Sequence, residues 1–491
     1  MARILIRAGK DPFTAVVPET TLTQDVFNSN SGNYLFQHSV WKALDVAPHE
    51  LVANSTLSER RAASPDDAAR INEEFDHFVI PMANSFRPDF ADKLENLSAL
   101  IEQLTIPTTV IGVGAQAPAA RSFDALADVR DATQRFVSAV LDRSASIGVR
   151  GEFTRDFLVH LGFPGDAVDV IGCPSLFLHG PDHHVHRKVD SLGPDSALAL
   201  NLTPEVPGIG AFATEQAERH PHLTYVGQDQ HDLRLLLWGV PHPHVSDPLV
   251  PTHLHHRLYQ EDRMRLFVDT WTWYDFLAEQ DFVYGTRFHG NVAALLGGTP
   301  AMMLAHDSRT LELAEYHRMP HRLQPHFDAP VDVDELYAAT DLTAFNEAMP
   351  ERFARYAAFL ERNGLDHRWQ PDRDSSLFDA RLAEASFPPA VHTLAAPDLS
   401  EVASRLEWLR HAAVIDLTRH PQRYEYPFNT PTYQGAGSRH ARLTEQRDAK
   451  LQRQQQRIDE LTTRLDRLER VTPGGLAIRL ARKLRSLFRR G

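Results

Sequence analysis

The 491-residue sequence predicts two α/β domains with a cleft between them, followed by a helical extension at the C-terminus. Two observations lead to this prediction. Short apolar segments typical of strands alternate with amphipathic segments typical of helices, first over residues 1–180 and again over residues 195–365. This alternation is typical of Rossmann-like units with parallel sheets. Between the two series, residues 179–194 are rich in Gly, Pro and His, as expected of an interdomain linker.

In the first series, each predicted strand is a short apolar run that ends at Gly, Pro or Arg. These strands are expected at residues 1–7, 75–81, 108–114, 146–150 and 168–172. The helices between them repeat large apolar residues at helical spacing, so that one face can pack on the sheet. They are expected at residues 90–104, 132–141 and 151–161.

The second series has the same kinds of element. Its strands are expected at residues 197–202, 223–227, 266–268, 281–286 and 301–304. Helices are expected at residues 271–279 and 291–296, and residues 330–365 are expected to be helical. Two such domains leave a cleft where ligands commonly bind. Residues 366–440 receive no assignment, apart from one helix predicted at 399–417.

Residues 441–472 carry a short heptad pattern. Its apolar positions are Leu451, Ile458, Leu461, Leu465 and Leu468. Gln454 interrupts the pattern, so the segment suits either a coiled coil that joins copies of the chain or a single helix.

Residues 474–491 are predicted to form a basic amphipathic helix. Its apolar face carries Leu476, Leu480, Leu484, Leu487 and Phe488. Residues 441–491 hold 14 Lys and Arg residues against 6 Asp and Glu residues, whereas the whole chain has a net charge of -14. A basic helix on an acidic body favours contact with an anionic membrane surface. A solvated helix, or one packed on a partner, is the alternative.

The composition predicts a cytoplasmic protein, peripheral at the inner face of the plasma membrane through the basic helix. An acidic chain does not suit general nucleic-acid binding. Cys173 is the only cysteine, which fits a reducing compartment and excludes an internal disulfide or a multi-Cys zinc site. No signal peptide or transmembrane segment is expected. The His-rich loops at 183–186 and 253–256 lack carboxylate or Cys ligands at suitable spacing, so no metal or cofactor is expected.

The clearest candidate site lies at residues 284–291, where an apolar strand runs into Arg-x-His-Gly and then a helix. Alternate strand residues project to the same face, so Arg287 and His289 are expected to point together above the strand's C-terminal end. The N–H groups of the helix favour an anion there. Arg can hold a carboxylate or phosphate, and His can move a proton near neutral pH. The alternative is structural, with Arg287 paired to a buried carboxylate and His289 capping the helix.

Residues 273–300 resemble the polysaccharide pyruvyl transferase family, in which R-x-H-(G/A)-x-x-x-A-L-x-x-G-x-P follows an apolar strand. Similar segments are residues 147–158 with 171–177, residues 305–315 and, more faintly, residues 31–34, which match the family's glycine turn. The resemblance spans about residues 25–320.

This resemblance implies a two-domain fold like that of GT-B glycosyltransferases. It also implies phosphoenolpyruvate as donor and a pyruvyl ketal on a sugar of a cell-surface polysaccharide or glycan as product. The family's Arg and His correspond to Arg287 and His289, which would hold the donor's carboxylate or phosphate and act as its acid. Two departures concern the acceptor side. Asn33 stands where the glycine turn usually continues into Asp, and Arg309 stands where the family often has Lys.

Two further candidates for substrate binding carry charge. Arg150 follows a predicted strand and would supply a second cation from the opposing domain, or else pair with Glu152 or Asp156. Asp307 would contact a ligand hydroxyl or cap the next helix.

The remaining candidates are small or neutral. Gly290 would let a ligand approach the backbone, with Asn291 beside it. Gly112 and Gly114 would line the cleft or form a tight turn. Cys173 is expected to be a buried small residue rather than a nucleophile, because nothing in the sequence lowers its pKa.

Two other functions stay open. One is a nucleotide-sugar glycosyltransferase of the same architecture, because Arg-x-His at a helix N-terminus suits a nucleotide diphosphate equally well. The other is a non-catalytic scaffold with a decayed site, because the tail and residues 366–440 have no part in the chemistry.

Overall fold

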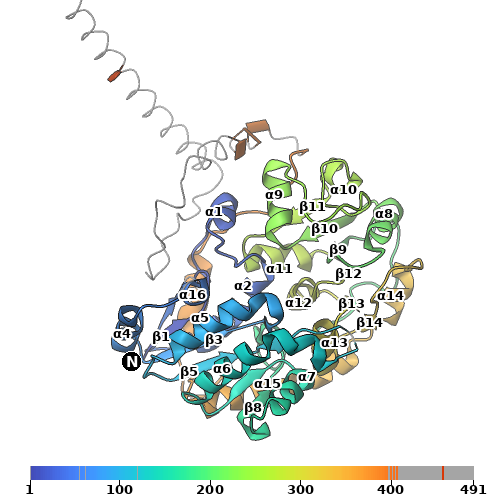
Figure 1. The fold of residues 1–491 in the computed structure, drawn as a ribbon. Coiled ribbons are helices and arrows are strands. Elements are labelled where there is room, and N and C mark those ends of the chain that lie inside the picture. The colour runs from blue at the N-terminus through green and yellow to red at the C-terminus, as the bar shows by residue number, and fades with distance from the viewer. Residues whose placement is uncertain are drawn as a thin grey trace, which may run out of the picture. The chain divides into compact units, whose positions relative to one another are not determined.

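The computed structural model describes residues 2–54, 56–60, 62–118, 120–395, 399–400, 402–403, 405–406 and 456–457. Two parallel sheets with helices packed on them confirm the predicted α/β class (Figure 1). The predicted coiled coil, apart from residues 456–457, and the basic helix at 474–491 lie outside the described residues. So does most of the helix predicted at 399–417. None of the described helices is long and apolar enough to span a membrane.

The first sheet has four parallel strands in the order β2-β1-β3-β5. They are β2 (Glu50–Ala53), β1 (Arg3–Ile6), β3 (His77–Pro81) and β5 (Thr108–Ile111). A second parallel pair, β7 (Ile147–Val149) and β8 (Val168–Val170), is joined to it by a bridge between Val113 and Val149. Every residue of β3 and β5 is buried, as expected for parallel strands covered on both faces.

The helices of this half follow the apolar spacing of the sequence. In α5 (Ala91–Ile101), the buried stripe contains Leu94, Leu97, Leu100 and Ile101. The other helices are α1 (Pro18–Thr23), α2 (Gly32–Leu44), α3 (Leu57–Arg60), α4 (Pro65–Glu74), α6 (Arg130–Leu141) and α7 (Glu152–His160). Two short strands, β4 (Asn84–Phe86) and β6 (Gly114–Ala115), pair just beyond the C-terminal ends of β3 and β5.

The second sheet has six parallel strands in the order β11-β10-β9-β12-β13-β14. They are β11 (Met264–Leu266), β10 (Leu223–Gly227), β9 (Leu198–Asn201), β12 (Phe282–Gly285), β13 (Ala301–Ala305) and β14 (His321–Leu323). The strand expected at 266–268 was therefore placed too late. Its pairing with β10 begins with Met264 opposite Tyr225, and the chain leaves the sheet before Asp269 caps the next helix.

The helices of the second half connect these strands. They are α8 (Ile209–Arg219), α9 (Gln230–Trp238), α10 (Arg257–Gln260), α11 (Thr270–Ala278), α12 (Phe288–Leu296) and α13 (Ser308–Tyr316). The helix expected at 291–296 thus begins earlier, at Phe288, which matters for the site described below.

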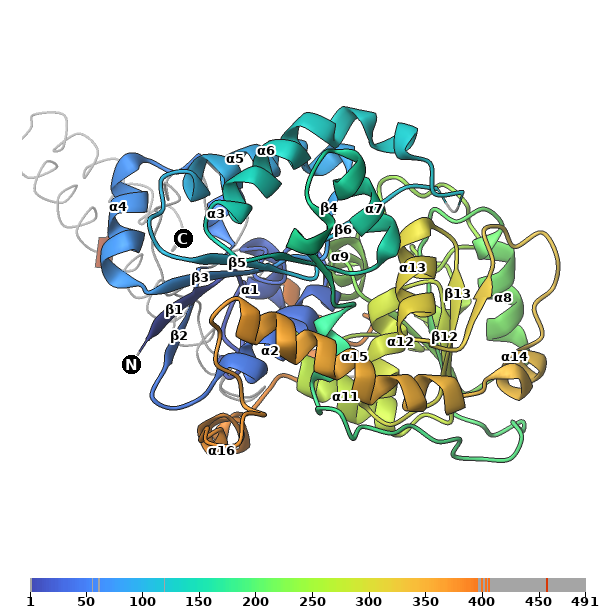
Figure 2. The same cartoon turned by 90° about the horizontal axis from the view of Figure 1, so that it is seen from below.

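Later segments tie the two halves together. After α14 (Val333–Ala339), the long helix α15 (Thr343–Arg362) passes from the second sheet back to the first (Figure 2). Arg362 at its end pairs with Asp169 of β8. The helix α16 (Ser376–Glu384) follows. One buried apolar cluster includes Ile6 from the first sheet and Met303 from the second, so both halves share a core.

Candidate active site

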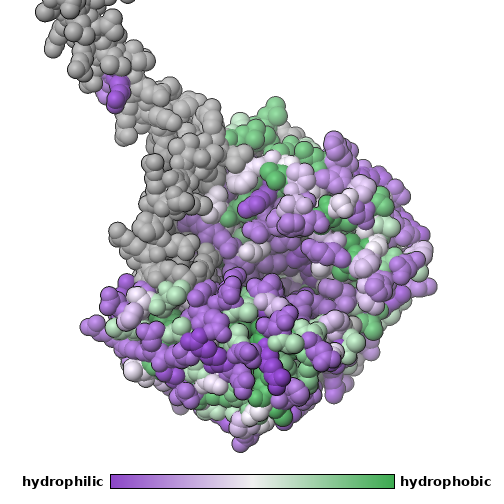
Figure 3. Space-filling view, viewed as in Figure 1, coloured by the Kyte–Doolittle hydropathy of each residue, from purple (hydrophilic) through white to green (hydrophobic). Residues whose placement is uncertain are grey.

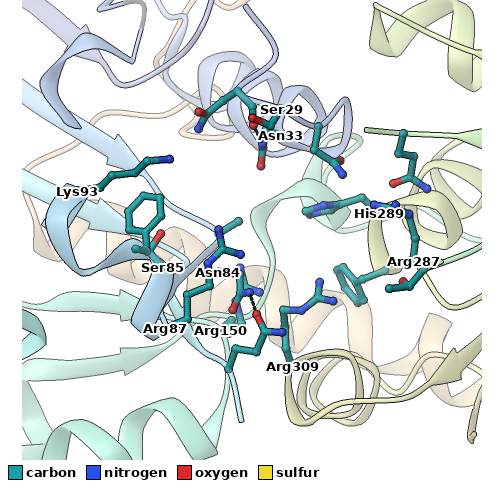
Figure 4. A pocket seen from close by; sticks show the side chains of 18 of the residues that line it. Ser29, Asn33, Asn84, Ser85, Arg87, Lys93, Arg150, Arg287, His289 and Arg309 are labelled. Atoms are coloured by element: carbon teal, nitrogen blue, oxygen red, sulfur yellow. Dashed lines mark hydrogen bonds between the residues drawn. The ribbon is translucent and has the colours of Figure 1, made fainter. Parts of the chain in front are cut away.

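A cavity of about 370 Å³ is lined by residues from both halves (Figure 4). Its size lies in the range that encloses a small-molecule ligand. Among the described residues, every charged side chain that lines it is cationic: Arg7, Arg87, Lys93, Arg150, Arg287 and Arg309. The polar neutral side chains are Asn28, Ser29, Asn30, Asn33, Asn84, Ser85, Gln116, Thr203 and Gln228. Such a wall suits an anionic ligand.

The face seen in Figure 1 is hollowed between the two halves, and hydrophilic side chains border the hollow (Figure 3). A polar border suits a site for a charged or hydroxyl-rich ligand. The arrangement agrees with the predicted cleft, because the ends of parallel strands carry the loops that bind ligands in such folds.

Arg287 and His289 both line the cavity, but not for the predicted reason. The expectation that they share one face of a strand is wrong, because β12 ends at Gly285 and His289 already lies in the first turn of α12. Gly285 turns the chain at φ +149°, where a Cβ atom would lie 1.9 Å from the Asn201 carbonyl oxygen, so only glycine fits. The first turn of α12 then presents both side chains to the cavity (Figure 4).

Arg287 is held from behind. Its Nε donates to the Leu202 carbonyl at 2.6 Å, and its Nη2 forms an ion pair with Asp229. Asp229 also caps α9 by accepting from the N–H groups of His231 and Asp232. The structural alternative for Arg287 is therefore present, and the same guanidinium still lines the cavity. Burial raises the pKa of Asp229, but the Arg287 charge and the hydrogen bonds of the cap together outweigh it, and the net shift is downward.

His289 is a neutral imidazole at physiological pH. Burial, with the charges of Arg150 and Arg309, lowers its pKa to about 3. Its Nε2 lies 3.8 Å from the Sγ of Cys173, which is fully buried. No side-chain cap of α12 is present, so the structural alternative for His289 is not what the structure has. Cys173 is buried, as the sequence predicted, and burial raises the pKa of its thiol.

Arg150 supplies a cation with no carboxylate partner. Its Nε and Nη2 face the Gly112 carbonyl at 3.4 Å, and among the described residues no acidic group lies within ion-pair distance. Glu152 pairs with Arg155 instead, so the expected alternative pair does not form. Burial lowers the pKa of Arg150 to about 10, which leaves it charged at neutral pH.

Gly112 and Gly114 support Arg150 rather than line the cavity. A Cβ atom on Gly114 would lie 2.2 Å from the Arg150 Cδ, so the arginine stem occupies the space that a side chain would need. Gly112 has φ +76°, in the left-handed region that favours glycine, and offers its carbonyl to the guanidinium.

Arg309 lines the cavity from the N-terminal turn of α13. Asp307 caps that helix, accepts from the Thr310 N–H at 2.8 Å and lies 3.3 Å from the Arg309 guanidinium. Burial opposes ionisation of Asp307, yet Arg309 and the cap bonds lower its pKa to about 2. Its position makes Asp307 a support for Arg309 instead of a ligand contact.

Asn33 lines the cavity from the first turn of α2, directly after a loop that contacts the second half. Its Nδ2 donates to the Asn28 carbonyl at 2.9 Å. The same loop forms a bridge between Asn30 and Asp229, and the Ser31 N–H donates to the Gln228 carbonyl at 2.8 Å. The loop thereby fixes one wall of the cavity to both halves.

A comparison with known protein families agrees with this geometry. A family model described as polysaccharide pyruvyl transferase matches residues 30–308. The chain belongs to the polysaccharide pyruvyl transferase family. The match covers the loop around Asn33, the Arg150 strand end and the Arg287-x-His289 turn, and the predicted enzyme class is confirmed. No curated protein sequence matches the chain.

Several solved structures are distantly similar to this family member. The Staphylococcus aureus MnaA–UDP structure has 12% identity and a TM-score of 0.36, and covers 89% of this chain and 100% of its own. A putative UDP-N-acetylglucosamine 2-epimerase from Listeria monocytogenes has 11% identity and a TM-score of 0.36, covering 87% and 100%. The UDP-GlcNAc 2-epimerase from Methanocaldococcus jannaschii has 11% identity and a TM-score of 0.37, covering 73% and 99%.

Two of the substrate-binding residues predicted for this pyruvyl transferase family member do not line the cavity and lie behind the residues that do. Gly290 is packed so that a Cβ atom would lie 2.6 Å from the Gln228 Nε2. Asn291 is fully buried and donates to the Arg287 carbonyl at 2.9 Å. Both positions stabilise the Arg287 turn and do not reach the cavity, so the expectation of direct ligand contact is corrected.

Sequence reasoning missed several wall residues from the first half. They are Arg7, Arg87, Lys93, Asn84, Ser85 and Asn28, together with Gln228 of the second half. A signal existed for two: Arg7 directly follows β1, and Asn84 follows β3 by a few residues, at the edge where ligands bind. Lys93 lies inside a helix and has no such signal. Among the described residues, no group of three or more His, Cys, Asp or Glu side chains could hold a metal ion.

Proposed function

We propose that this cavity transfers a pyruvyl group from phosphoenolpyruvate to two hydroxyl groups of a sugar in a cell-surface polysaccharide or glycan. The observation that carries the proposal is Arg150, a buried guanidinium without a carboxylate partner among the described residues, next to a neutral imidazole. The donor has a carboxylate and a phosphate, so it needs fixed cations beside a group that moves protons. Membership in the family supports the same reading.

The reaction replaces one C–O bond of the donor by two. A proton is added to the methylene carbon, which becomes a methyl group and leaves an oxocarbenium-like centre at the adjacent carbon. The first sugar hydroxyl attacks that centre and gives up its proton. The second hydroxyl attacks as the phosphate departs with the electrons of its C–O bond, and the proton of that hydroxyl leaves on the phosphate. The products are a ketal and inorganic phosphate.

The residues that line the cavity would have different roles in this reaction. Arg150, Arg287 and Arg309 would bind the carboxylate and phosphate of the donor. Burial is the main cause of the low pKa of His289 in the free protein, and the charges of Arg150 and Arg309 lower it further. The bound donor would offset those charges. The pKa of His289 would then rise, and the imidazolium would give its proton to the methylene carbon and regain one from the first hydroxyl.

The test is phosphate release from phosphoenolpyruvate in the presence of a panel of glycans. Replacing His289 with Ala is expected to lower release by about 100-fold or more, because a proton-transfer group is lost. His222→Ala is the matched control, since His222 is exposed. Unchanged release by the His289→Ala variant would remove that residue from the mechanism.

Thermal protection separates the competing functions. Phosphoenolpyruvate is expected to raise the melting temperature, and UDP-glucose is not. Protection by UDP-glucose alone would support a nucleotide-sugar glycosyltransferase. Protection by neither ligand, with no phosphate release, would support a scaffold whose site has decayed.

A further inference from the structure

The wall opposite His289 holds a second unpaired cation. Lys93 lies in the first turn of α5, and Figure 4 shows it on the far side of the cavity from Arg287 and His289. Its Nζ lies 4.9 Å from the centre of the Phe90 ring. Among the described residues it has no carboxylate within ion-pair distance and no hydrogen-bond partner. Its charge is therefore available to a ligand.

Another cation, Arg87, lies near the same ring as Lys93. The Arg87 guanidinium lies 5.7 Å from the same Phe90 ring and lines the cavity. Its only carboxylate partner within the described part of the chain is Asp89, whose side chain is 73% exposed. A solvated partner offsets little of the arginine charge. Burial lowers the pKa of Lys93, Glu59 raises it, and the neighbouring Arg7 and Arg87 charges lower it. Glu59 is itself paired with Arg7, so an anion placed here would relieve the repulsion between the cations.

Two amide groups that line the cavity suit a sugar. Asn84 Oδ1 and Gln228 Nε2 are buried atoms with no hydrogen-bond partner in the described residues, and both side chains line the cavity. Buried amide atoms without partners cost free energy unless a ligand or water satisfies them. Sugar hydroxyls both donate and accept, so a sugar can satisfy an amide oxygen and an amide nitrogen together.

The donor does not account for all of these charges. The Arg150 and Arg309 charges act on His289, so they belong to the end where the donor would react. Arg87 interacts with both Arg309 and Lys93, so it lies between that end and Lys93. Lys93 lies at the other end of the cavity (Figure 4). The cavity thus has one unpaired cation at each end, Arg150 and Lys93, and this arrangement fits two separate anionic groups.

We propose that Lys93 and Arg87 form a second anion subsite, which binds an acidic group carried by the acceptor sugar and makes the enzyme select acidic acceptors. This proposal rests on the proposed function, because it assigns the His289 end to the donor. The shared chemistry is an anionic oxygen group. Its source is either a carboxylate on the sugar ring or a phosphate on its anomeric carbon.

The experiment uses the full chain with saturating phosphoenolpyruvate and three acceptors: a methyl glucoside, the matching methyl glucuronide and glucose 1-phosphate. Lys93→Met is expected to raise the KM of the acidic acceptors by about 10- to 100-fold, the usual loss for a hydrogen bond to a charged group. The KM of the neutral glucoside is expected to stay unchanged. Whichever acidic acceptor loses more affinity identifies the source of the anion.

Two variants make the result specific. Lys93→Arg should restore most of the preference, because it restores the charge. Lys42→Met is the matched control, since Lys42 also lies over a phenyl ring, 5.7 Å from the centre of Phe378, but does not line the cavity. An equal loss for neutral and acidic acceptors would overturn the proposal. Weaker binding of phosphoenolpyruvate to Lys93→Met would also overturn it, because Lys93 would then serve the donor.

Direct binding separates this proposal from the proposed function. Calorimetric titration of the glucuronide and the glucoside into the wild-type chain needs no turnover. Preferential binding of the glucuronide that Lys93→Met abolishes would support the subsite even if no phosphate were released, a result that would refute only the transfer reaction. Equal binding of both sugars by the wild type would refute the subsite, whatever the catalytic result.

Discussion

The two walls of the cavity hold their positive charges differently. On the wall from the second sheet, Arg287 and Arg309 each pair with an aspartate that also caps a helix. On the wall from the first sheet, Arg150 and Lys93 have no carboxylate partner among the described residues, although the other two arginines there are paired. A paired cation is held in place by its partner. An unpaired cation keeps its full charge for a ligand and destabilises the empty site.

Removing the unpaired Arg150 should produce the largest effect, and it tests most directly whether the unpaired cations serve the ligand. Arg150→Met is expected to lower kcat/KM for phosphoenolpyruvate by about 100-fold or more, because a preorganised charge is lost. Its melting temperature should stay the same or rise, because a desolvated charge is removed. Steady-state phosphate release and thermal unfolding test both parts. A large loss of stability with normal kinetics would make Arg150 a structural residue.

Removing a counterion should have the opposite signature. Asp229→Asn keeps a good helix cap but leaves Arg287 unpaired. We expect a loss of about 2 kcal/mol in the free energy of unfolding, below the usual cost for a fully buried pair because this one is partly exposed. Urea unfolding measures it. Asp89→Asn is the matched control, with an expected loss of about 0.5 kcal/mol or less for its exposed pair. Equal losses in both variants would contradict the difference between the pairs.

The low pKa of His289 predicts a smaller effect that depends on pH. The folded pKa, about 3, lies below the unfolded value near 6.5, so only the unfolded chain takes up this proton between those values. Stability from this group is therefore present above about pH 6.5 and lost as pH falls. Between pH 7 and pH 5, His289→Asn should lose about 1 kcal/mol less than the wild type, after allowance for its partial exposure. Urea unfolding at both pH values would show no difference if the imidazole were protonated in the folded state.

The smallest effect is expected at Cys173. Cys173→Ala removes the sulfur that lies 3.8 Å from the His289 Nε2, and should change kcat by about twofold, because no covalent step passes through a buried thiol of raised pKa. Phosphate release by this variant is the measurement. Complete loss of activity in a folded protein would make the thiol a nucleophile.

Much of the second wall could be predicted from a short stretch of sequence. The Arg-x-His turn is local, because a strand, a glycine that alone fits its position and a helix start follow one another directly. The predicted geometry failed in one detail: α12 begins three residues earlier than the apolar pattern suggests. Helix N-termini depend on which N–H groups find partners, and apolar spacing does not reveal this.

The first wall could not be predicted in the same way. Arg150 was a candidate because it ends a strand, whereas Lys93 looks like an ordinary surface residue of an amphipathic helix. Its significance depends on the cavity beside it and on the absence of a carboxylate within reach in the described structure. Both are properties of packing between distant segments.

The sequence by itself determined the alternation of strands and helices, because side-chain periodicity and burial act over a few residues. It also determined the Arg-x-His turn, for the same local reason. Only the tertiary structure decided which cations are free. Arg287 pairs with Asp229, 58 residues earlier in the sequence, and Arg7 pairs with Glu59, 52 residues later. Among the described residues, no acidic side chain lies within ion-pair distance of Arg150 or Lys93, although Glu312 and Glu59 act on them from farther away. Ion pairing falls off steeply with distance, so the free charges of the site are set by where the fold places distant carboxylates.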